Sequence, residues 1–180
     1  MEPRNPVLSS GWRRTMFRAR YQETDRMGVV YHANYLNWFE IGRTDMFRQL
    51  GFTYRSMEEL GILLPVTSAD LQFKSPARYD DHIAVYARLT TFSALRVVYE
   101  YEIRRLTDSE FAGIGAAESG FAGVTRPPLA PQDFAGELLV AGTTSHVWVN
   151  GDWKPVRLDR ALPELFREIA AALREEGGTV

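Results

Sequence analysis

The sequence contains no cysteine and no long apolar run. The absence of cysteine excludes disulfides, thiolate nucleophiles and zinc sites built on cysteine. No apolar stretch approaches the roughly 20 residues that a membrane-spanning helix needs. The segment 1–14 also lacks the apolar core of a signal peptide. We therefore expect a protein without a membrane span that works in the cytoplasm.

Neither sign of charge is in excess. The chain has 21 Lys and Arg against 23 Asp and Glu, a formal net charge of -2. Nonspecific binding to nucleic acid usually needs a basic face, so this balance argues against a nucleic-acid partner. Glycine-rich phosphate loops and metal-binding spacings such as HExxH are also absent. We expect no metal and no bound cofactor.

The periodicity of the apolar residues predicts an α+β domain. Apolar spacings of three and four predict an aromatic-rich helix over 32–50 and an amphipathic helix over 159–176. In the first of these helices, Asn34 is the expected cap and Gly51 the expected end. Alternating patterns predict strands at 15–21, 63–73, 83–92, 96–106 and 138–149. This order favours an antiparallel sheet of about five strands wrapped around the first helix.

Two segments fall outside these patterns. Residues 1–14 carry prolines and serines and predict a flexible tail, which leaves a single domain over 15–176. Residues 107–136 are rich in Gly, Ala and Pro and predict a long inserted loop. A loop of this length is usually functional or disordered. It is either a surface insertion or a lid or partner contact that carries Phe111, Phe121 and Phe134.

The most informative segment is 21–45, which reads YQETDRMGVVYHANYLNWFEIGRTD. It sets the carboxylate of Asp25 in a glycine-containing turn just before the aromatic-rich helix. The first turn of a helix has unpaired N–H groups and the positive end of the helix dipole, which suit an anion. Gly28 allows a tight turn and a close approach of substrate to the backbone. A carboxylate opposite such N–H groups is sufficient for a hydrolytic site without metal, cysteine or a serine triad.

This segment resembles the hotdog-fold acyl-CoA thioesterases. The run DRMGVVYHANY at 25–35, followed by WFE at 38–40, meets the family pattern without a gap. It is most similar to the 4-hydroxybenzoyl-CoA thioesterase-like group and its bacterial Tol-Pal-associated relatives. Downstream, DLQFKSPARYDD at 70–81, TTSHV at 143–147 and PVRL at 155–158 resemble later strands of the family. The stretch 107–136 departs from the family, where a short hairpin turn usually joins these strands.

The resemblance implies a hotdog fold and an acyl- or aryl-CoA thioester as substrate, with coenzyme A as part of that substrate. It implies a homodimer or homotetramer with sites between subunits. Asp25 matches the aspartate that acts as base or nucleophile on the thioester carbonyl. The backbone N–H of His32 matches the donor that stabilises the oxyanion.

Five further residues are candidates for substrate binding: Gly28, Tyr31, Tyr35, Lys74 and Arg78. The two cations could meet the phosphates of coenzyme A, although a base on a strand is more often part of a solvated face. Tyr35 and Trp38 have the spacing of core residues and are also candidate walls of an acyl pocket.

Glu40 is the alternative base, because a different hotdog clade uses a helix glutamate. The simpler interpretation is an ion pair with Arg43 at i+3. Glu23 and Asp45 resemble ordinary solvated or capping charges. His82 and His146 are too isolated in the sequence to be assigned a role.

Two other functions stay open. Hydratases and dehydratases of acyl thioesters share the fold but carry a catalytic histidine, often near a His-Phe-Pro-Gly segment that this chain lacks. The second is an acyl-CoA-binding or protein-interaction module without catalysis, which would bind acyl-CoA and release no thiol.

Overall fold

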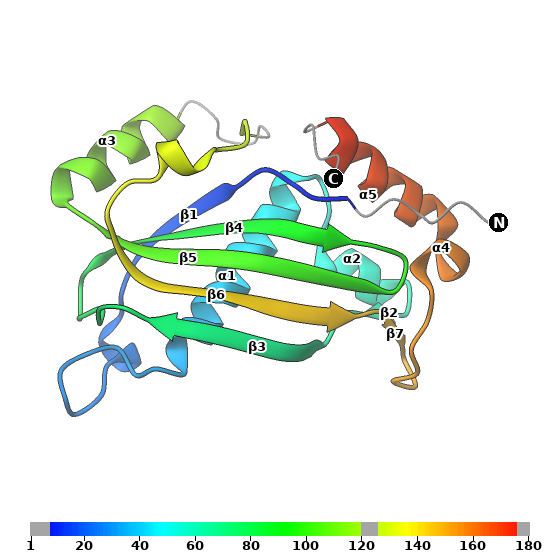
Figure 1. The fold of residues 1–180 in the computed structure, drawn as a ribbon, viewed down its shortest axis with the longest axis horizontal. Coiled ribbons are helices and arrows are strands. Elements are labelled where there is room, and N and C mark those ends of the chain that lie inside the picture. Colours follow the sequence, from blue (N-terminus) through cyan, green and yellow to red (C-terminus); the bar gives the residue numbers. More distant parts are fainter. Residues whose placement is uncertain (1–7, 120–125, 176–180) are drawn as a thin grey trace.

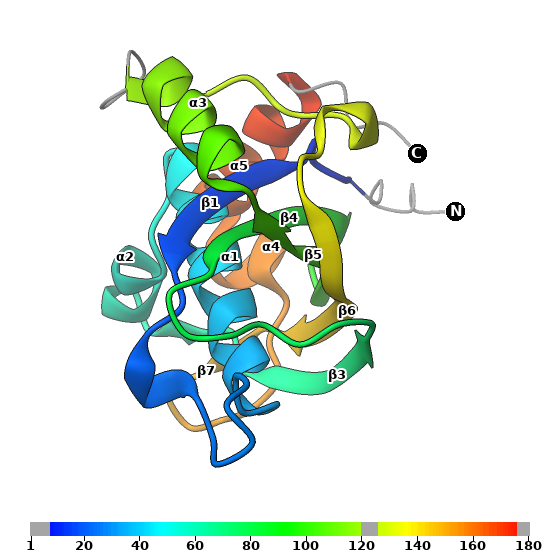
Figure 2. The same ribbon diagram turned by 90° about the vertical axis from the view of Figure 1, so that its left-hand side faces the viewer.

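The main layer of the protein is a five-stranded antiparallel sheet with the order β1-β4-β5-β6-β3. A computed structural model describes residues 8–119 and 126–175. Helix α1 (Asn34–Gln49) lies against one face of the sheet, and the strands curve around it (Figures 1 and 2). This arrangement confirms the predicted α+β class. The strands are β1 (Arg13–Arg18), β3 (Val66–Phe73), β4 (His82–Phe92), β5 (Arg96–Leu106) and β6 (Glu137–Val147).

The central helix packs very closely on the sheet. Trp38, Phe39, Met46 and Phe47 of α1 are buried, and the ring of Phe39 stacks on Tyr101 of β5 at 4.1 Å between ring centroids. Near the middle of the helix, a Cβ placed on Gly42 would lie 2.6 Å from a methyl group of Val85. The glycine therefore lets the helix backbone approach β4.

The sequence predicted the residue that ends α1 correctly, but it did not predict the residue that caps its start. Gly51 follows the last turn with a φ of 93°, so its predicted role at the end is confirmed. The prediction that Asn34 caps the start is wrong, because the cap position belongs to Ala33 and no side chain caps it. The amide of Asn34 instead donates to the carbonyl oxygen of Glu23 at 2.8 Å.

Several short elements escaped the sequence patterns. Helix α2 (Tyr54–Glu59) is capped by the hydroxyl of Thr53, which accepts from the Ser56 N–H. A second, two-stranded sheet joins β2 (Ile62–Leu63) to β7 (Val149–Asn150). The single helix predicted over 159–176 is two helices, α4 (Leu158–Ala161) and α5 (Pro163–Glu175). Pro163 disfavours helical geometry at the residue before it, and Leu162 has φ and ψ of -138° and 72°.

The prediction of a long loop at 107–136 needs correction. Residues 108–118 form helix α3 (Asp108–Glu118), and a 3-10 turn, η3, follows at Pro131–Asp133. Thr107 and Glu110 cap α3 reciprocally, through Thr107 N–H to Glu110 Oε2 at 2.7 Å and Glu110 N–H to Thr107 Oγ1 at 3.2 Å. Phe121 lies outside the described residues.

The inserted segment covers part of the outer face of the sheet. Phe111 of α3 and Phe134 belong to an apolar cluster centred on Trp12, Tyr86 and Leu106. The prediction of a flexible tail over 1–14 does not hold for residues 8–14, because Leu8 and Trp12 are buried, and residues 1–7 lie outside the described residues. Leu8 exchanges backbone hydrogen bonds with Phe92 of β4. In the described part of the chain, no helix is both long and apolar enough to cross a membrane.

A buried polar network crosses the inner face of β5 and β6. Tyr101 OH is 2.7 Å from Thr144 Oγ1, which is 2.9 Å from Nε2 of His146. The other ring nitrogen of His146 is 3.2 Å from the carbonyl oxygen of Leu64. Burial lowers the pKa of His146 to about 4. His146 is therefore a neutral core residue and is not placed near Asp25.

Gly42 and Gly113 offer a matched test of the close helix packing. Both are helical, but a Cβ on Gly113 would meet no atom within 4 Å. We expect Gly113→Ala to raise the free energy of unfolding by about 0.5–1 kcal/mol through helix propensity. Gly42→Ala should lower the free energy of unfolding by about 1–3 kcal/mol, because overpacking against Val85 outweighs the gain in helix propensity. Urea unfolding measures both, and equal effects would contradict the packing.

The buried His146 predicts a pH dependence of stability. Its pKa is about 4 in the folded chain and about 6.5 when unfolded, so folding favours the neutral ring. The stabilisation is fully present above pH 6.5 and is lost as the pH falls toward 4, by about 3 kcal/mol. Between pH 6.5 and 4 the free energy of unfolding should fall less in His146→Gln than in the unaltered protein, as measured by urea unfolding at each pH. The same pH dependence in both proteins would contradict the role of the buried His146.

Candidate active site

Asp25 lies in a short hairpin, residues 24–30, which we call the Asp25 turn. An isolated bridge joins Thr24 to Val30, and the Asp25 N–H donates to the carbonyl of Val29 at 2.9 Å. The Gly28 N–H donates back to the carbonyl of Asp25 at 3.0 Å, and Gly28 has a φ of 74°. This left-handed conformation is the reason that the turn needs glycine. One carboxylate oxygen of Asp25 accepts from the Met27 N–H at 2.8 Å.

Glu23 ties the Asp25 turn to the start of α1. It is only 8% exposed. Its carboxylate accepts from the indole N–H of Trp38 at 2.9 Å and from the Arg20 N–H at 2.7 Å. Its carbonyl accepts from the Tyr31 N–H and the amide of Asn34, at 2.9 and 2.8 Å. The expectation that Glu23 is a solvated charge is therefore wrong, although it does cap the 3-10 turn η1 (Tyr21–Glu23).

The start of α1 presents backbone donors beside this turn. The N–H groups of Asn34, Tyr35 and Leu36 donate to carbonyls three residues earlier. Within the described residues, the N–H groups of His32 and Ala33 donate no hydrogen bond. They are the unpaired donors expected at the start of a helix.

Asp25 and His32 line a common cleft, which we call the Asp25 cleft. Its volume is about 240 Å³. Predicted site residues that line it are Asp25, His32, Tyr35 and Lys74. The remaining lining residues are mostly apolar: Met27, Val29, Val30, Phe73, Ser75 and Pro76. The site thus combines one carboxylate, one cation and backbone donors with apolar walls.

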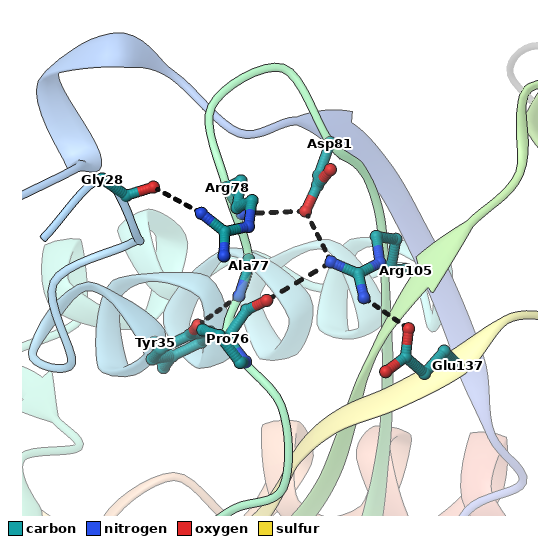
Figure 3. Close-up of polar contacts among 8 residues, drawn as sticks. All are labelled: Gly28, Tyr35, Pro76, Ala77, Arg78, Asp81, Arg105 and Glu137. Atoms are coloured by element: carbon teal, nitrogen blue, oxygen red, sulfur yellow. Dashed lines mark hydrogen bonds and ion pairs between the residues drawn. The ribbon is translucent and has the colours of Figure 1, made fainter.

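The loop between β3 and β4 is held against the Asp25 turn and α1 (Figure 3). Ala77 donates its N–H to the hydroxyl of Tyr35 at 2.9 Å and accepts from the Val30 N–H at 2.8 Å. The guanidinium of Arg105 donates to the carbonyl of Pro76 at 3.3 Å and to the carboxylate of Asp81 at 3.2 Å. Burial raises the pKa of Tyr35, so its hydroxyl stays protonated and can accept this bond. The β3–β4 loop, which forms one wall of the cleft, is therefore hydrogen-bonded to the Asp25 turn and α1, which form the other.

Three predicted substrate-binding residues lie at the edge of the cleft and do not line it. Gly28 shapes the turn, and the exposed ring of Tyr31 lies beside that of His32 at 4.4 Å between centroids. The guanidinium of Arg78 reaches the carbonyl of Gly28 at 3.5 Å (Figure 3). Arg78 is exposed, so its charge is accessible at the mouth of the site.

Glu40 lies in a different pocket from Asp25. That pocket is also lined by Arg43, Tyr54 and Leu64. Glu40 is 3.8 Å from Arg43 at i+3 and its side chain is 66% exposed, which agrees with the ion-pair interpretation. Asp45 is not merely a solvated charge, since it accepts from Thr15 and Gln49. No cluster of His, Asp or Glu able to hold a metal occurs in the described part of the chain.

Comparison with known proteins identifies the family. Residues 19–150 match the model of the thioesterase-like superfamily. The chain belongs to this superfamily. It is 34% identical to the putative acyl-CoA thioesterase YneP of Bacillus subtilis, over 81% of this chain and 86% of that protein. It is 29% identical to the acyl-CoA thioester hydrolase YbgC of Escherichia coli, over 56% of this chain and 73% of that protein.

Solved structures of this superfamily agree with the fold. The DHNA-CoA thioesterase of Staphylococcus aureus superposes with a TM-score of 0.70 at 34% identity, covering 94% of this chain and 97% of that one. The predicted hotdog fold and the predicted resemblance to thioester hydrolases are thereby confirmed. The individual roles of Asp25, His32 and the other candidate residues stay predictions.

Glu23 and the Ala77 loop are the parts of the site that the sequence did not reveal. Glu23 precedes a turn and has no helical spacing that would predict its burial. Its partner Trp38 has one polar atom, the indole N–H, and a buried indole usually needs an acceptor. A buried Trp38 therefore predicts that some acceptor lies close to its indole, but the sequence does not identify Glu23 as that acceptor.

The double acceptor role of Glu23 gives a test of how the site is held. A glutamine at this position has one acceptor oxygen, so Glu23→Gln should leave either the Trp38 indole or the Arg20 N–H facing an amide donor. We expect a loss of about 1–3 kcal/mol in the free energy of unfolding. The control is Glu59→Gln, which removes an exposed ion pair with Arg55 and should cost below about 0.5 kcal/mol. Equal losses in urea unfolding would contradict this account of Glu23.

Proposed function

We propose that this protein hydrolyses acyl-CoA thioesters, with Asp25 as the base or nucleophile and the His32 N–H as oxyanion donor. The observation that carries the proposal is that one cleft is lined by both Asp25 and His32, the residue whose N–H is unpaired just before the start of α1. The acyl-CoA thioesterases among its relatives supply the substrate class.

As a base, Asp25 takes a proton from water while the water oxygen attacks the thioester carbonyl carbon. The carbonyl oxygen becomes negatively charged and accepts a hydrogen bond from the His32 N–H. A donor aimed at such an oxyanion contributes roughly 3–4 kcal/mol to the transition state. The C–S bond then breaks, and the proton returns to the departing thiolate. As a nucleophile, Asp25 would attack the carbonyl carbon and expel the thiolate of coenzyme A as the C–S bond breaks, and water would hydrolyse the resulting mixed anhydride to the free acid and the regenerated carboxylate in a second step.

The walls of the cleft suit the other parts of the substrate. Val29, Val30 and Phe73 offer apolar contact to an acyl or aryl group. Lys74 lines the cleft and Arg78 lies at its mouth, so both can meet the phosphates of coenzyme A. Acyl carrier protein, the alternative carrier of such thioesters, would need an additional protein-binding face. We take coenzyme A as the carrier and the cytoplasm as the place of action.

Asp25→Asn tests the mechanism in a thiol-release assay across aliphatic and aromatic acyl-CoAs. The amide is a poor base and nucleophile, so we expect kcat to fall about 10²–10⁴-fold on every thioester that the unaltered protein hydrolyses. The thermal midpoint should change little, because the amide oxygen can still accept from Met27.

The matched control is Asp80→Asn, an exposed aspartate in a left-handed conformation that asparagine also tolerates. It should keep full activity. Turnover near that of the unaltered protein in Asp25→Asn would remove Asp25 from the mechanism. Absence of thiol release by the unaltered protein on all thioesters would contradict the proposed activity.

A further inference from the structure

A second cleft lies at the end of α1, between the C-terminal ends of α3 and α5. It consists of two adjoining pockets with volumes of about 190 and 500 Å³, which share Arg13, Gln49, Arg126 and Pro127. We call the two pockets together the arginine cleft. Apolar side chains make up much of its wall: Leu50, Ala117, Pro128, Leu129 and Ala172. Figure 1 shows α3 and α5 above β1, with their C-terminal ends toward each other.

The arginine cleft is separate from the Asp25 cleft. The two have no lining residue in common. Asp25 and His32 lie before the first turn of α1, whereas Gln49 and Leu50 lie at its end. The 16 residues of this helix span roughly 24 Å along its axis. A small molecule in the arginine cleft therefore does not reach Asp25.

Arg14 and Arg126 share one carboxylate in this cleft. Nε and Nη2 of Arg14 donate to Oε1 of Glu118 at 3.2 and 2.7 Å. Nη1 of Arg126 is 3.0 Å from the other oxygen of Glu118. Two positive charges therefore face one negative charge. Arg13 lines the cleft as well but is engaged in an interaction of its own, so we assign the unbalanced charge to Arg14 and Arg126 alone.

Arg126 keeps donors available for a ligand. In the part of the chain that the structure describes, the guanidinium of Arg126 makes the ion pair with Glu118 and no other hydrogen bond. Its side chain is 33% exposed, and it lines both pockets. A guanidinium presents N–H groups in a planar fork that matches the two oxygens of a carboxylate. The remaining N–H groups of Arg126 can therefore bind an oxyanion inside the arginine cleft.

The charges in the cleft favour a singly charged ligand. Glu118 lines the smaller pocket and Glu175 the larger one. A phosphate group with two negative charges would be repelled by both carboxylates, while only one positive charge is left to balance it. A carboxylate brings one charge, and the apolar walls suit a hydrocarbon or aromatic body.

We propose that the arginine cleft binds a monocarboxylic acid with an apolar body. The carboxylate pairs with Arg126 and Arg14, and the apolar body lies against Leu50 and Leu129. This second site goes beyond the proposed function and does not depend on it, although acids of this class are also what thioester hydrolysis releases. Helix α3 and residues 126–129 of the segment 107–136 supply one side of the cleft, which gives that segment a ligand-binding role.

Calorimetric titration of the full chain with octanoate and with benzoate tests the charge assignment. Arg126→Gln should weaken the binding of these acids about tenfold or more, because it removes a charged hydrogen-bond donor. Glu118→Gln should strengthen it roughly threefold or more, because Arg14 and Arg126 lose the carboxylate that competes with the ligand. An unfolded variant cannot give stronger binding, so the opposite signs separate a role of charge from a loss of structure.

Two controls accompany these variants. Arg160→Gln removes an exposed arginine of α4 and should leave the affinity unchanged. Octanamide, which has the same apolar body without the charge, should bind the unaltered protein about tenfold more weakly than octanoate. Unchanged affinity for both acids in Arg126→Gln would overturn the proposal, as would weaker binding in Glu118→Gln or equal binding of octanamide.

Photolabelling tests the position of the site. The probe 4-benzoylbenzoate carries a carboxylate on an apolar body and forms a covalent bond to nearby C–H groups under light. Mass spectrometry should find the label on residues that line the arginine cleft, such as Leu50 or Leu129, and excess octanoate should suppress it. A label confined to the residues of the Asp25 cleft, or one that octanoate does not suppress, would overturn the proposal. None of these measurements uses thiol release, so failure of acid binding and failure of the thioesterase activity are separate results.

Discussion

The candidate site depends on a buried carboxylate, that of Glu23, which does not line the Asp25 cleft. Glu23 accepts from the Trp38 indole and the Arg20 N–H, and its carbonyl holds Tyr31 and Asn34. These four hydrogen bonds set the distance between the Asp25 turn and the first turn of α1. A buried charge is tolerated only when hydrogen bonds replace its lost hydration. The Trp38 indole and the Arg20 N–H supply those hydrogen bonds to Glu23, and the bond from Asn34 to its carbonyl holds the Asp25 turn beside the start of α1.

A second set of hydrogen bonds and ion pairs holds the β3–β4 loop, which forms the opposite wall of the cleft. Arg105 contacts Pro76, Asp81 and Glu137, and so joins the β3–β4 loop to β5 and β6. Ala77 then connects that loop to Tyr35 and Val30. Most of these bonds involve backbone atoms, whose positions are set by the fold. A site held in this way can keep its geometry when the side chains that line the cleft are changed.

The sequence predicted the parts of the fold that are governed by periodicity. The strands at 83–92 and 96–106 agree with β4 and β5 within one residue, and the helix at 32–50 contains α1. Asp25, His32, Tyr35 and Lys74, four of the residues singled out from the sequence, line one cleft, while their roles stay predictions. Helix α3 was missed because its alanines and glycines give little apolar contrast between faces, although the Thr107–Glu110 capping box was present in the sequence. The burial of Glu23 could not be predicted, because it depends on a tertiary partner 15 residues away.

Helix α3 and Phe134 occupy the outer face of the sheet above Tyr86 and Leu106. Two sheets stacked face to face lie only about 10 Å apart, which is close to the thickness of a helix with its side chains. The space that a stacked neighbour would need is therefore already filled at this end of the molecule. The insertion thus takes up surface on the outer face of the sheet that another molecule would otherwise reach, while none of its described residues lines the Asp25 cleft.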